Sequence, residues 1–559
     1  MPPVAVGKYV AHDGCVQLDE GKDHDLTVMM GIAYVDGFVF DPATKTTTCA
    51  IAISPCVAGA IPCMIRVPMS TLSNQKAICE LLGERGIIVC HPGHASKYLI
   101  ASASAVTKRA VRELVKSPRW VAEYRAFFNG KDLIASPEVD VDKYWVESSR
   151  SSPMNARGNL TKWRKKIGTH IAANPIVLVM TCVAITSIFL ERLGLGSSMY
   201  NFFGQKGRGK TLGQQCAGSV FGNAVDPAQG AQVEDVPYLA RFNGTLNGFE
   251  VLLGQYSPLP VLLDELTEGS ASMICQATYM MASGQGKHRM TSTGQAASRE
   301  RWQSNVIVTA EVSITDAVAA TGKPMHGGQL DRAIDIPISE VGIFNSFGSF
   351  GSFAELTRHL KRACGEQYGT PGEAIIQYCC DNPGEVQRLL AQAQQIEEDL
   401  LPPDCGPGER RVVKRFAGAA VAGRIAVKAK VFDEDAVEAI DEAIKMVVDL
   451  WWGSRAAGLG RVRQLLEDNA DSVQVGKPEP DSDAFAFVDD AITVIPVNVF
   501  SREFGRDGDA TRILDELAGL GALKTEQPGR RVHRFCNNSV RGYAIFNNRI
   551  WPELEWPAA

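Results

Sequence analysis

The middle of the chain alternates short apolar runs with longer amphipathic segments. Strands that are buried on both faces read as nearly continuous apolar runs, and parallel strands need helical crossovers between them. The pattern therefore predicts an α/β domain built on a parallel sheet. The predicted strands fall at 199–203, 259–266, 305–311 and 332–338.

The first part of the chain has a different pattern. Its apolar runs are shorter, and the helical segment that follows them ends at Gly86, a residue type on which helices commonly end. This mixture predicts a compact α+β domain, in which no catalytic group of residues stands out. Its predicted strands fall at 27–35, 38–40, 48–53 and 63–69.

The last third of the chain is largely helical. Amphipathic segments between 353 and 453 predict a helical lid, and an α/β core followed by such a lid is the layout of AAA+ ATPases. A helix over 507–523 followed by two strand-like runs predicts a winged-helix domain. We therefore expect domains at 1–147, 148–342, 343–475 and 476–559.

One apolar run, from Asn174 to Leu190, raises the question of a membrane span. It is shorter than a bilayer requires, and Asn174-Pro175 is typical of a helix cap followed by proline at the first helical position. We expect a buried helix and no membrane contact.

Charge and cysteine usage narrow the class of protein. The net charge is -6 and charged residues make up 21%, which argues against a generally basic nucleic-acid coat. A local basic channel stays open, because clusters rather than totals set the local field. The fourteen cysteines contain no C-x-x-C pair, so we expect reduced thiols in a cytoplasmic protein.

Residues 204–211 fit the pattern G-x-x-x-x-G-K-[ST], between a predicted strand and a predicted helix. In such a loop the backbone N–H groups surround phosphates, the lysine neutralises them, and the threonine hydroxyl holds Mg²⁺. The alternative is a chance glycine turn. The sequence predicts ATP and Mg²⁺ as cofactors, bound by Gly204, Gln205, Lys206, Gly207, Arg208, Gly209, Lys210, Thr211 and Leu212.

Polar residues follow the later predicted strands. Asp264 and Glu265 end an apolar run, where Asp264 would help to hold the metal with Thr211 and Glu265 would polarise the attacking water; helix capping is the alternative. Thr309 would orient that water, unless it is an ordinary strand-terminal threonine. Arg332 precedes the last strand, where ring ATPases place a finger that reaches a neighbouring subunit's phosphate. Its alternative is a salt bridge with Asp331 or Asp335.

Two clusters of cations are candidates for DNA contact. Lys287, His288 and Arg289 follow a glycine turn between the Asp264 and Thr309 strands, a position that suits a hairpin facing the pore of a ring helicase. Arg530, Arg531 and Arg534, with His533 among them, surround the expected turn between the last two strands. For both clusters the alternative is a solvated surface loop.

These stretches resemble the domain of unknown function 927 family, found in helicase-like proteins of bacterial mobile elements and prophages. The resemblance rests on segments that occur in order across about residues 150 to 450, and it extends more weakly to the first 145 residues. The segments are FFGQKGRGKT, TLNGFE, LLDEL, YMMASGQGK, GGQLDRAIDIP, QYGTPG and RFAGAAVAGRIA.

Some members of this family resemble minichromosome-maintenance-type helicases, which are AAA+ rings that unwind DNA using ATP. The resemblance implies a hexamer whose ATP site includes Lys210, Thr211, Asp264 and Glu265, with Lys287 in the DNA loop and Arg332 as the finger. It also places Arg415 where a lid arginine senses nucleotide. The family's glycine-glutamate-leucine in the lid reads Gly423-Arg424-Ile425 here, which leaves no glutamate for that role.

The leading hypothesis is an ATP-driven DNA helicase or translocase that serves replication of a mobile element. The alternative is a nucleotide-gated ring scaffold, such as a replication initiator or a defence-associated protein, that binds DNA or protein without unwinding. A third reading is a P-loop kinase of a small molecule, which the long lid and Arg332 argue against.

Overall fold

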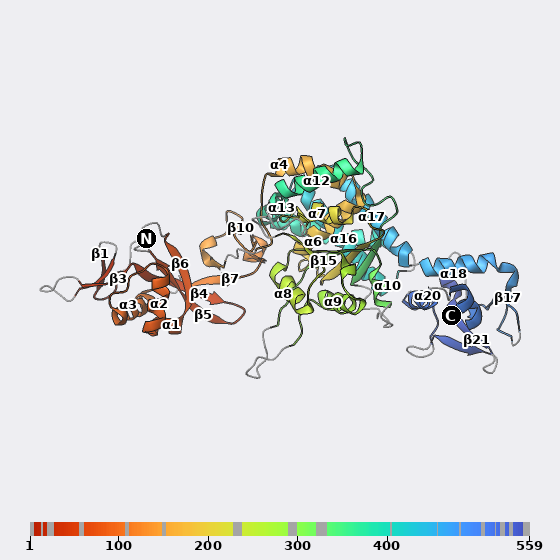
Figure 1. The fold of residues 1–559 in the computed structure, drawn as a ribbon, viewed down its shortest axis with the longest axis horizontal. Coiled ribbons are helices and arrows are strands. Elements are labelled where there is room, and N and C mark those ends of the chain that lie inside the picture. Colours follow the sequence, from red (N-terminus) through yellow and green to blue (C-terminus); the bar gives the residue numbers. More distant parts are fainter. Residues whose placement is uncertain are drawn as a thin grey trace. The chain divides into compact units, whose positions relative to one another are not determined.

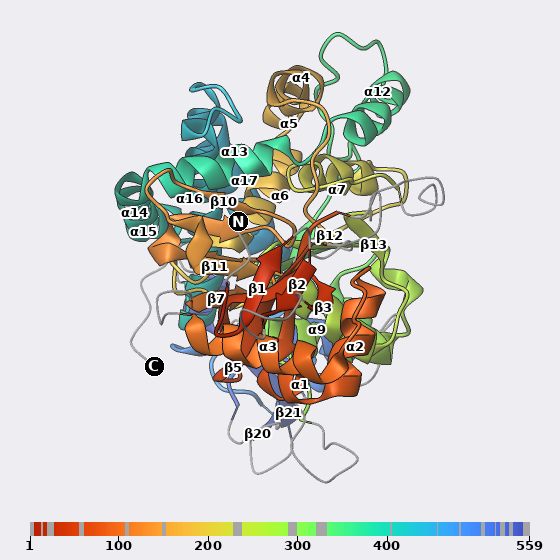
Figure 2. The same ribbon diagram turned by 90° about the vertical axis from the view of Figure 1, so that its left-hand side faces the viewer.

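A computed structural model describes most of the chain (Figures 1 and 2). The chain divides into two compact units, Met1–Arg150 and Ser151–Ala559. The described residues are 5–12, 15–19, 27–54, 61–106, 111–147, 152–226, 237–288, 299–319, 332–402, 405–455, 457–479, 482–504, 509–519, 521–525, 531–535 and 540–551.

The first unit is a mixed α+β body, as its sequence pattern predicts. Its main sheet has the order β11–β7–β4–β5–β6, and α3 packs against β4. The predicted strand at 27–35 is divided at Ile32 between β3 and β4, and Gly86 follows α2 in a left-handed conformation (φ +79°).

The bounds in this unit are β1 (Tyr9–His12), β2 (Cys15–Leu18), β3 (Thr27–Gly31), β4 (Ala33–Asp41), β5 (Thr46–Ile53), β6 (Cys63–Pro68), α1 (Met69–Ser73), α2 (Gln75–Glu84), α3 (Pro92–Ala105), β7 (Val111–Val115), β8 (Arg119–Val121), β9 (Ala126–Phe128), β10 (Leu133–Ala135) and β11 (Tyr144–Val146). Strands β1–β2–β3 and β10–β9–β8 form two smaller sheets.

The second unit contains the predicted parallel sheet. Its order is β13 (Leu239–Arg241), β14 (Val261–Asp264), β15 (Asn305–Ala310), β12 (Ser198–Phe203) and β16 (Ala333–Pro337), and every neighbouring pair is parallel. Helices α8 (Leu246–Tyr256) and α9 (Ala271–Ser283) cover one face, while α6 (Pro175–Thr186) and α7 (Lys210–Gly218) lie on the other (Figure 1). Strand β15 therefore lies between β12, which precedes the phosphate loop, and β14, which ends at Asp264.

The helices expected as a lid form and pack onto this body. Helices α16 and α17 pack against each other and against α6, α17 also contacts β16, and α12 contacts α7. Arg424 donates to Gln392 Oε1 (3.0 Å) and Asp441 Oδ2 (2.8 Å). The bounds are α12 (Phe353–Glu366), α13 (Thr370–Asp381), α14 (Pro383–Ala391), α15 (Ala393–Leu400), α16 (Pro407–Lys428) and α17 (Ala436–Arg455).

A C-terminal sheet, of order β17–β18–β19–β21–β20, has its own apolar core that begins at Val462. This core includes α18 and therefore extends upstream of the expected boundary at 476. The predicted helix and the two strands after it form as α20, β20 and β21. The bounds are α18 (Ala457–Asp468), β17 (Val473–Val475), β18 (Ala486–Val488), β19 (Ile492–Pro496), α19 (Val497–Phe504), α20 (Asp509–Gly519), β20 (Val532–Phe535), β21 (Val540–Phe546) and α21 (Asn547–Ile550).

The apolar run after Asn174 is the core helix α6, whose residues 176–186 are all buried. Among the described helices none alone has the length and apolarity of a membrane span, although Leu160–Ala172 and Pro175–Phe189, bent by 117° relative to each other, meet that criterion as a pair. The first of these consists of α4 (Leu160–Trp163), a π-helical turn and α5 (Thr169–Ala172).

Asn174 occupies the predicted cap position before Pro175, but its side chain does not cap α6. Fully buried, it accepts the N–H groups of Asn345 (2.7 Å) and Ser346 (2.8 Å) and donates to the carbonyls of His170 (2.7 Å) and Ser346 (3.0 Å). This amide joins the break between α5 and α6 to the segment that follows β16.

We expect Asn174→Ala to lower the free energy of unfolding by about 3 kcal/mol, because two buried N–H donors lose their acceptor. The matched control is Asn159→Ala, which removes an exposed cap of α4 and should cost only about 1 kcal/mol. Urea denaturation followed by tryptophan fluorescence measures both. Equal losses for the two variants would contradict the buried network.

Candidate functional site: a phosphate loop and a carboxylate cluster

The loop after β12 has the backbone geometry of a phosphate cradle. Gly204, Gly207 and Gly209 all have positive φ, at +155°, +78° and +86°. A Cβ at Gly204 would lie 2.8 Å from the carbonyl oxygen of Ile338, and one at Gly209 would lie 3.0 Å from the ring of Phe344. Gly209 is the N-cap of α7, so the loop leads directly into a helix N-terminus. Only glycine fits these positions without strain.

Lys210 folds back into this loop. Its Nζ donates to the carbonyls of Gly204 and Gln205, the second at 2.8 Å. Burial lowers the pKa of this ammonium, and the nearby carboxylates of Glu265, Glu311 and Asp264 act in the opposite direction. A phosphate in the loop would supply an anionic acceptor for an ammonium that is now held by neutral carbonyls.

The other predicted loop residues divide into exposed and buried ones. Lys206 is exposed, and Arg208 donates to Gln205 Oε1 (2.7 Å). Leu212 is buried and fixes the first turn of α7 in the core.

Asp264 is the centre of a hydroxyl–carboxylate cluster. The Thr211 hydroxyl donates to its Oδ1 at 3.0 Å, and the Thr309 hydroxyl donates to the same oxygen at 2.6 Å. The strand order brings them together, because β15 pairs with β12 on one side and β14 on the other. Three residues distant in sequence thus meet at the carboxyl ends of adjacent parallel strands.

Glu265 adopts a left-handed backbone conformation (φ 59°, ψ 66°), which costs a non-glycine residue on the order of 1 kcal/mol. Its N–H donates to the Thr309 hydroxyl (3.3 Å), and its carboxylate accepts from the Thr267 hydroxyl. Backbone strain of this kind concentrates at functional sites. Thr309 therefore holds both carboxylate residues in place.

Gln214 is a further residue that supports the site, and it was not predicted from the sequence. It is fully buried on α7, and its amide donates to the carbonyls of Leu263 (3.0 Å) and Ile307 (3.1 Å). These bonds tie the helix after the loop to β14 and β15, which carry Asp264 and Thr309 at their carboxyl ends. The only signal in the sequence is a polar residue one turn after Lys210.

These residues fit a magnesium-bound nucleoside triphosphate. The loop offers N–H groups and Lys210 to phosphates, and the Thr211 hydroxyl and Asp264 carboxylate offer oxygen ligands, which Mg²⁺ prefers. Within the described ranges no cluster of three or more His, Cys, Asp or Glu residues could hold a metal, and no disulfide joins the described cysteines.

The segment with Lys287 forms the stem of a hairpin at the end of α9. Gly286 N–H donates to the Glu300 carbonyl (2.9 Å), Trp302 N–H donates to the Gly284 carbonyl (3.0 Å), and Gln285 pairs with Arg301. Lys287 and His288 are exposed, and Arg299 Nη1 lies 3.1 Å from His288 Nε2. Arg289 lies outside the described residues.

Arg332 and Arg415 lie together at the amino ends of the parallel strands, whereas the phosphate loop lies at their carboxyl ends. Arg332 precedes β16, its carbonyl accepts Met199 N–H at the start of β12, and its side chain is exposed. Arg415 is buried and donates to the Gly196 carbonyl (2.7 Å). Both line a cavity of about 520 Å³. Arg415 is therefore fixed near the amino ends of the strands, away from the phosphate loop of its own chain, and its role in sensing nucleotide stays a prediction.

The alternative that Arg332 forms a salt bridge with Asp335 is not supported, because other groups hold the Asp335 carboxylate. This buried carboxylate accepts from Asn201 Nδ2 (2.7 Å) and from the N–H of Ile314 (2.8 Å), and burial raises its pKa. Asp335 thus caps α10 (Ile314–Ala319). Asp331 lies outside the described residues.

The C-terminal cations do not surround the final turn as expected. Arg531 immediately precedes β20 and Arg534 lies on it, paired in register with Arg541 of β21. His533 is buried, with Nε2 2.6 Å from the Lys524 carbonyl oxygen. Arg530 lies outside the described residues. Alternation of side chains along β20 leaves Arg534 exposed and His533 in the core.

With this geometry in place, the chain can be compared with known proteins. The sequence model of the domain of unknown function 927 family matches residues 59–301. The match includes FFGQKGRGKT, TLNGFE, LLDEL and YMMASGQGK. It begins well before residue 150 and ends before GGQLDRAIDIP. No curated protein sequence matches the chain.

A solved structure of the SCCmec type IV Cch protein, described as an active helicase, has the same fold. It is 16% identical, with a TM-score of 0.62, and the comparison covers 98% of this chain and 99% of that one. The apo A form of the NrS-1 C-terminal region is 11% identical over 91% of this chain and 95% of that one, and its TM-score of 0.29 carries no structural argument.

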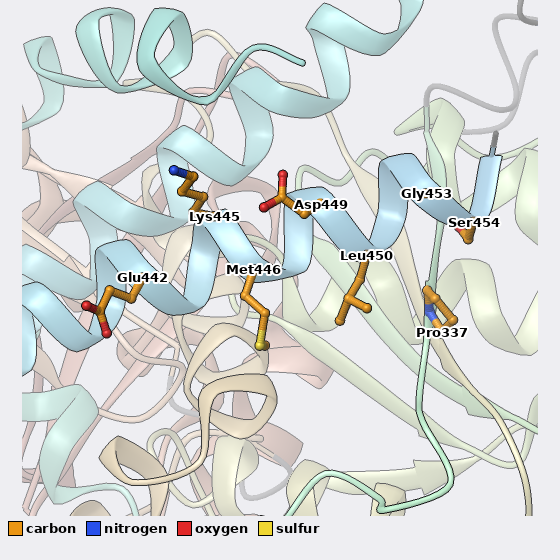
Figure 3. Close-up of a pocket in the computed structure, with 8 residues that line it drawn as sticks. All are labelled: Pro337, Glu442, Lys445, Met446, Asp449, Leu450, Gly453 and Ser454. Carbon is orange, nitrogen blue, oxygen red and sulfur yellow. The ribbon is translucent and has the colours of Figure 1, made fainter. Parts of the chain in front are cut away.

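A separate groove of about 800 Å³ runs along α17, and Met446 and Leu450 extend from that helix on the side of Pro337 (Figure 3). It is lined by Pro337, Glu442, Lys445, Met446, Asp449, Leu450, Gly453 and Ser454. It contains none of the loop or cluster residues, so the candidate chemistry does not lie in it.

We expect Thr309→Val to weaken magnesium-dependent nucleotide binding about tenfold, because Asp264 loses a donor and the Glu265 N–H loses its acceptor. Thr309→Ser keeps the hydroxyl and is the control. Titration with a fluorescent ATP analogue in the presence of Mg²⁺ measures both. Wild-type affinity in the valine variant would contradict the linking role of Thr309.

Proposed function

We propose that this chain is an ATP-dependent DNA helicase or translocase, of the ring-forming AAA+ type, that serves replication of a mobile element or prophage. The observation that carries the proposal is the contact of Thr211 and Thr309 with Asp264 beside the Lys210 loop. The sheet order, and a fold shared with a protein described as an active helicase, support it.

The residues divide the chemistry of hydrolysis among them. Loop N–H groups and Lys210 would bind the β- and γ-phosphates, while Thr211 and Asp264 would hold Mg²⁺. Bound magnesium-ATP supplies the electrophilic phosphorus and a neutralised leaving group. Glu265 would accept a proton from the attacking water at its carboxylate, and Thr309 would keep Glu265 and Asp264 in register.

The distance between the amino and carboxyl ends of the parallel strands supports a ring of subunits. Strand β12 has six residues, so Arg332 and the phosphate loop lie roughly 20 Å apart along it. Arg332 therefore cannot contact phosphates in its own loop, and it would act on those held by a second copy. Arg415 lies at the same ends of the strands and would face the same neighbour.

Two surfaces would contact DNA. Lys287 and His288 are exposed on the hairpin, and Arg531 and Arg534 lie at the start of and on β20. Phosphate contacts from such side chains give affinity without reading sequence. A motor requires the hairpin for stimulation by DNA, whereas a ring scaffold that does not unwind would bind through the C-terminal cations.

The experiment that tests the proposal is ATP hydrolysis with and without single-stranded DNA, together with the native mass. We expect DNA to stimulate hydrolysis several-fold and the mass to be that of a hexamer. Lys210→Ala should reduce hydrolysis by at least about a hundredfold, because the phosphates lose their neutralising cation. Lys361→Ala removes an exposed lysine from α12 and is the control. Undiminished turnover in Lys210→Ala would overturn the ATPase assignment, and hydrolysis indifferent to DNA would favour the scaffold.

Mixing experiments test the proposed role of Arg332. If it acts on a neighbouring subunit, adding Arg332→Ala protein to wild type at constant total concentration should lower activity more steeply than in proportion to the wild-type fraction. Arg358→Ala, which removes an exposed arginine of α12, should produce no such loss. A strictly proportional decline for Arg332→Ala would contradict action between subunits.

A further inference from the structure

Glu250 is a buried carboxyl residue outside the cluster described above. It lies on α8 and only 1% of its surface is exposed. Its Oε1 accepts the backbone N–H of Lys287 at 3.2 Å. A Cβ on Gly286 would lie 2.8 Å from Oε2, so a larger residue here would displace the Glu250 carboxylate or the hairpin backbone. Burying a carboxyl group costs free energy unless it is hydrogen-bonded. The bond to the Lys287 N–H therefore stabilises both Glu250 and the position of the hairpin backbone.

The same face of α8 contacts the other side of the hairpin stem. Gly254 is one helical turn after Glu250, and a Cβ there would lie 2.5 Å from Glu300 Oε2. Glu300 in turn accepts Gly286 N–H through its carbonyl. Both sides of the stem are therefore docked on one helix face.

The residue beside Glu250 connects α8 to the nucleotide site. The ring of Phe249 stacks on that of Phe242, with centroids 5.0 Å apart and planes at 25°. Both are buried, and Phe242 N–H donates to the carbonyl of Asp264 at 2.9 Å. Helix α8 thus packs through Phe249 on Phe242, the residue that bonds the Asp264 backbone, and it bonds the stem of the basic hairpin through Glu250.

We propose that α8 couples the nucleotide site to the basic hairpin, and that Glu250 is the positioning residue that fastens the hairpin to it. The inference rests on the proposed function, since it concerns how DNA at Lys287 changes hydrolysis at Asp264. Glu250 contacts neither nucleotide nor DNA. It sets where the Lys287 backbone lies relative to α8, so a shift of Asp264 is passed to the hairpin through packed groups.

The test compares the ratio of DNA-stimulated to basal ATP hydrolysis. We expect Glu250→Ala, which removes the acceptor of the Lys287 N–H, to lower this ratio by about fivefold, within the range found for residues that carry coupling between sites. Glu250→Gln keeps a neutral acceptor and should lower the ratio less. Gly286→Ala should lower it similarly to Glu250→Ala, and the double variant Glu250→Ala/Gly286→Ala should lose less than the product of the two single losses, because the clash disappears with the side chain. Loss of fold would lower both rates together and leave the ratio unchanged.

Glu397→Gln is the matched control. Glu397 is also a buried carboxyl residue, but it is held by Arg410 Nε (2.7 Å) in the helical body and touches neither α8 nor the hairpin. It should keep the wild-type ratio. A wild-type ratio in Glu250→Ala and Gly286→Ala as well would overturn the inference.

Hydrogen–deuterium exchange separates this inference from the proposed function. We expect a non-hydrolysable ATP analogue with Mg²⁺ to change exchange in residues 284–288 and 299–302 of the wild type, and to have little effect there in Glu250→Ala. That result supports the coupling even if DNA does not stimulate wild-type hydrolysis, an outcome that would count against the motor alone. An identical response in both proteins would overturn the coupling.

Discussion

Two hydroxyl groups hold the Asp264 carboxylate in position, one from helix α7 and one from strand β15. The geometry of the candidate site depends on the position of that carboxylate. Thr211 lies in the first turn of α7, and Thr309 lies near the carboxyl end of β15, the strand between β12 and β14. If β14 lay directly beside β12, Thr309 would not reach Asp264 or support Glu265. The strand order is thus the constraint that places Thr211, Asp264 and Glu265 beside the phosphate loop.

The body beneath this site is held by buried polar groups as well as apolar packing. Gln214 ties α7 to β14 and β15, and Asn174 ties the start of α6 to the segment after β16. Each amide satisfies backbone groups that cannot reach water, so its loss exposes an unpaired donor or acceptor in the core. The helices expected to form a lid pack on α6, which makes them part of the support for the loop.

The two ends of the parallel strands have different roles in the proposed mechanism. Lys210, Asp264 and Glu265 lie at the carboxyl ends of the strands, whereas Arg332 and Arg415 lie at the amino ends, a strand's length away. A subunit organised in this way offers phosphate ligands on one edge and cations on the other, which is the arrangement that a ring of identical subunits requires. In the proposed ring, the hairpin on α8 would be the surface that responds to nucleotide.

Much of the fold could be predicted from the sequence, because periodicity and the G-x-x-x-x-G-K-T spacing are local. The strands at 199–203 and 305–311, the helices after residue 353 and the buried α6 all form where their patterns predict. The short edge strand β13 was missed, since three residues at a sheet edge carry little periodic signal. Gln214 and Glu250 were missed because a buried polar residue looks like a surface one until its partners are known.

By itself the sequence determined the order and type of the central elements and the chemistry of the loop, because both depend on residues that are neighbours along the chain. Only the tertiary structure decided that Thr309 reaches Asp264, that Arg415 lies with Arg332 rather than at the loop, and that Glu250 holds the hairpin. These contacts join residues 45, 219 and 37 positions apart. The order of strands and the packing of helices across the sheet set them, and no local pattern encodes either.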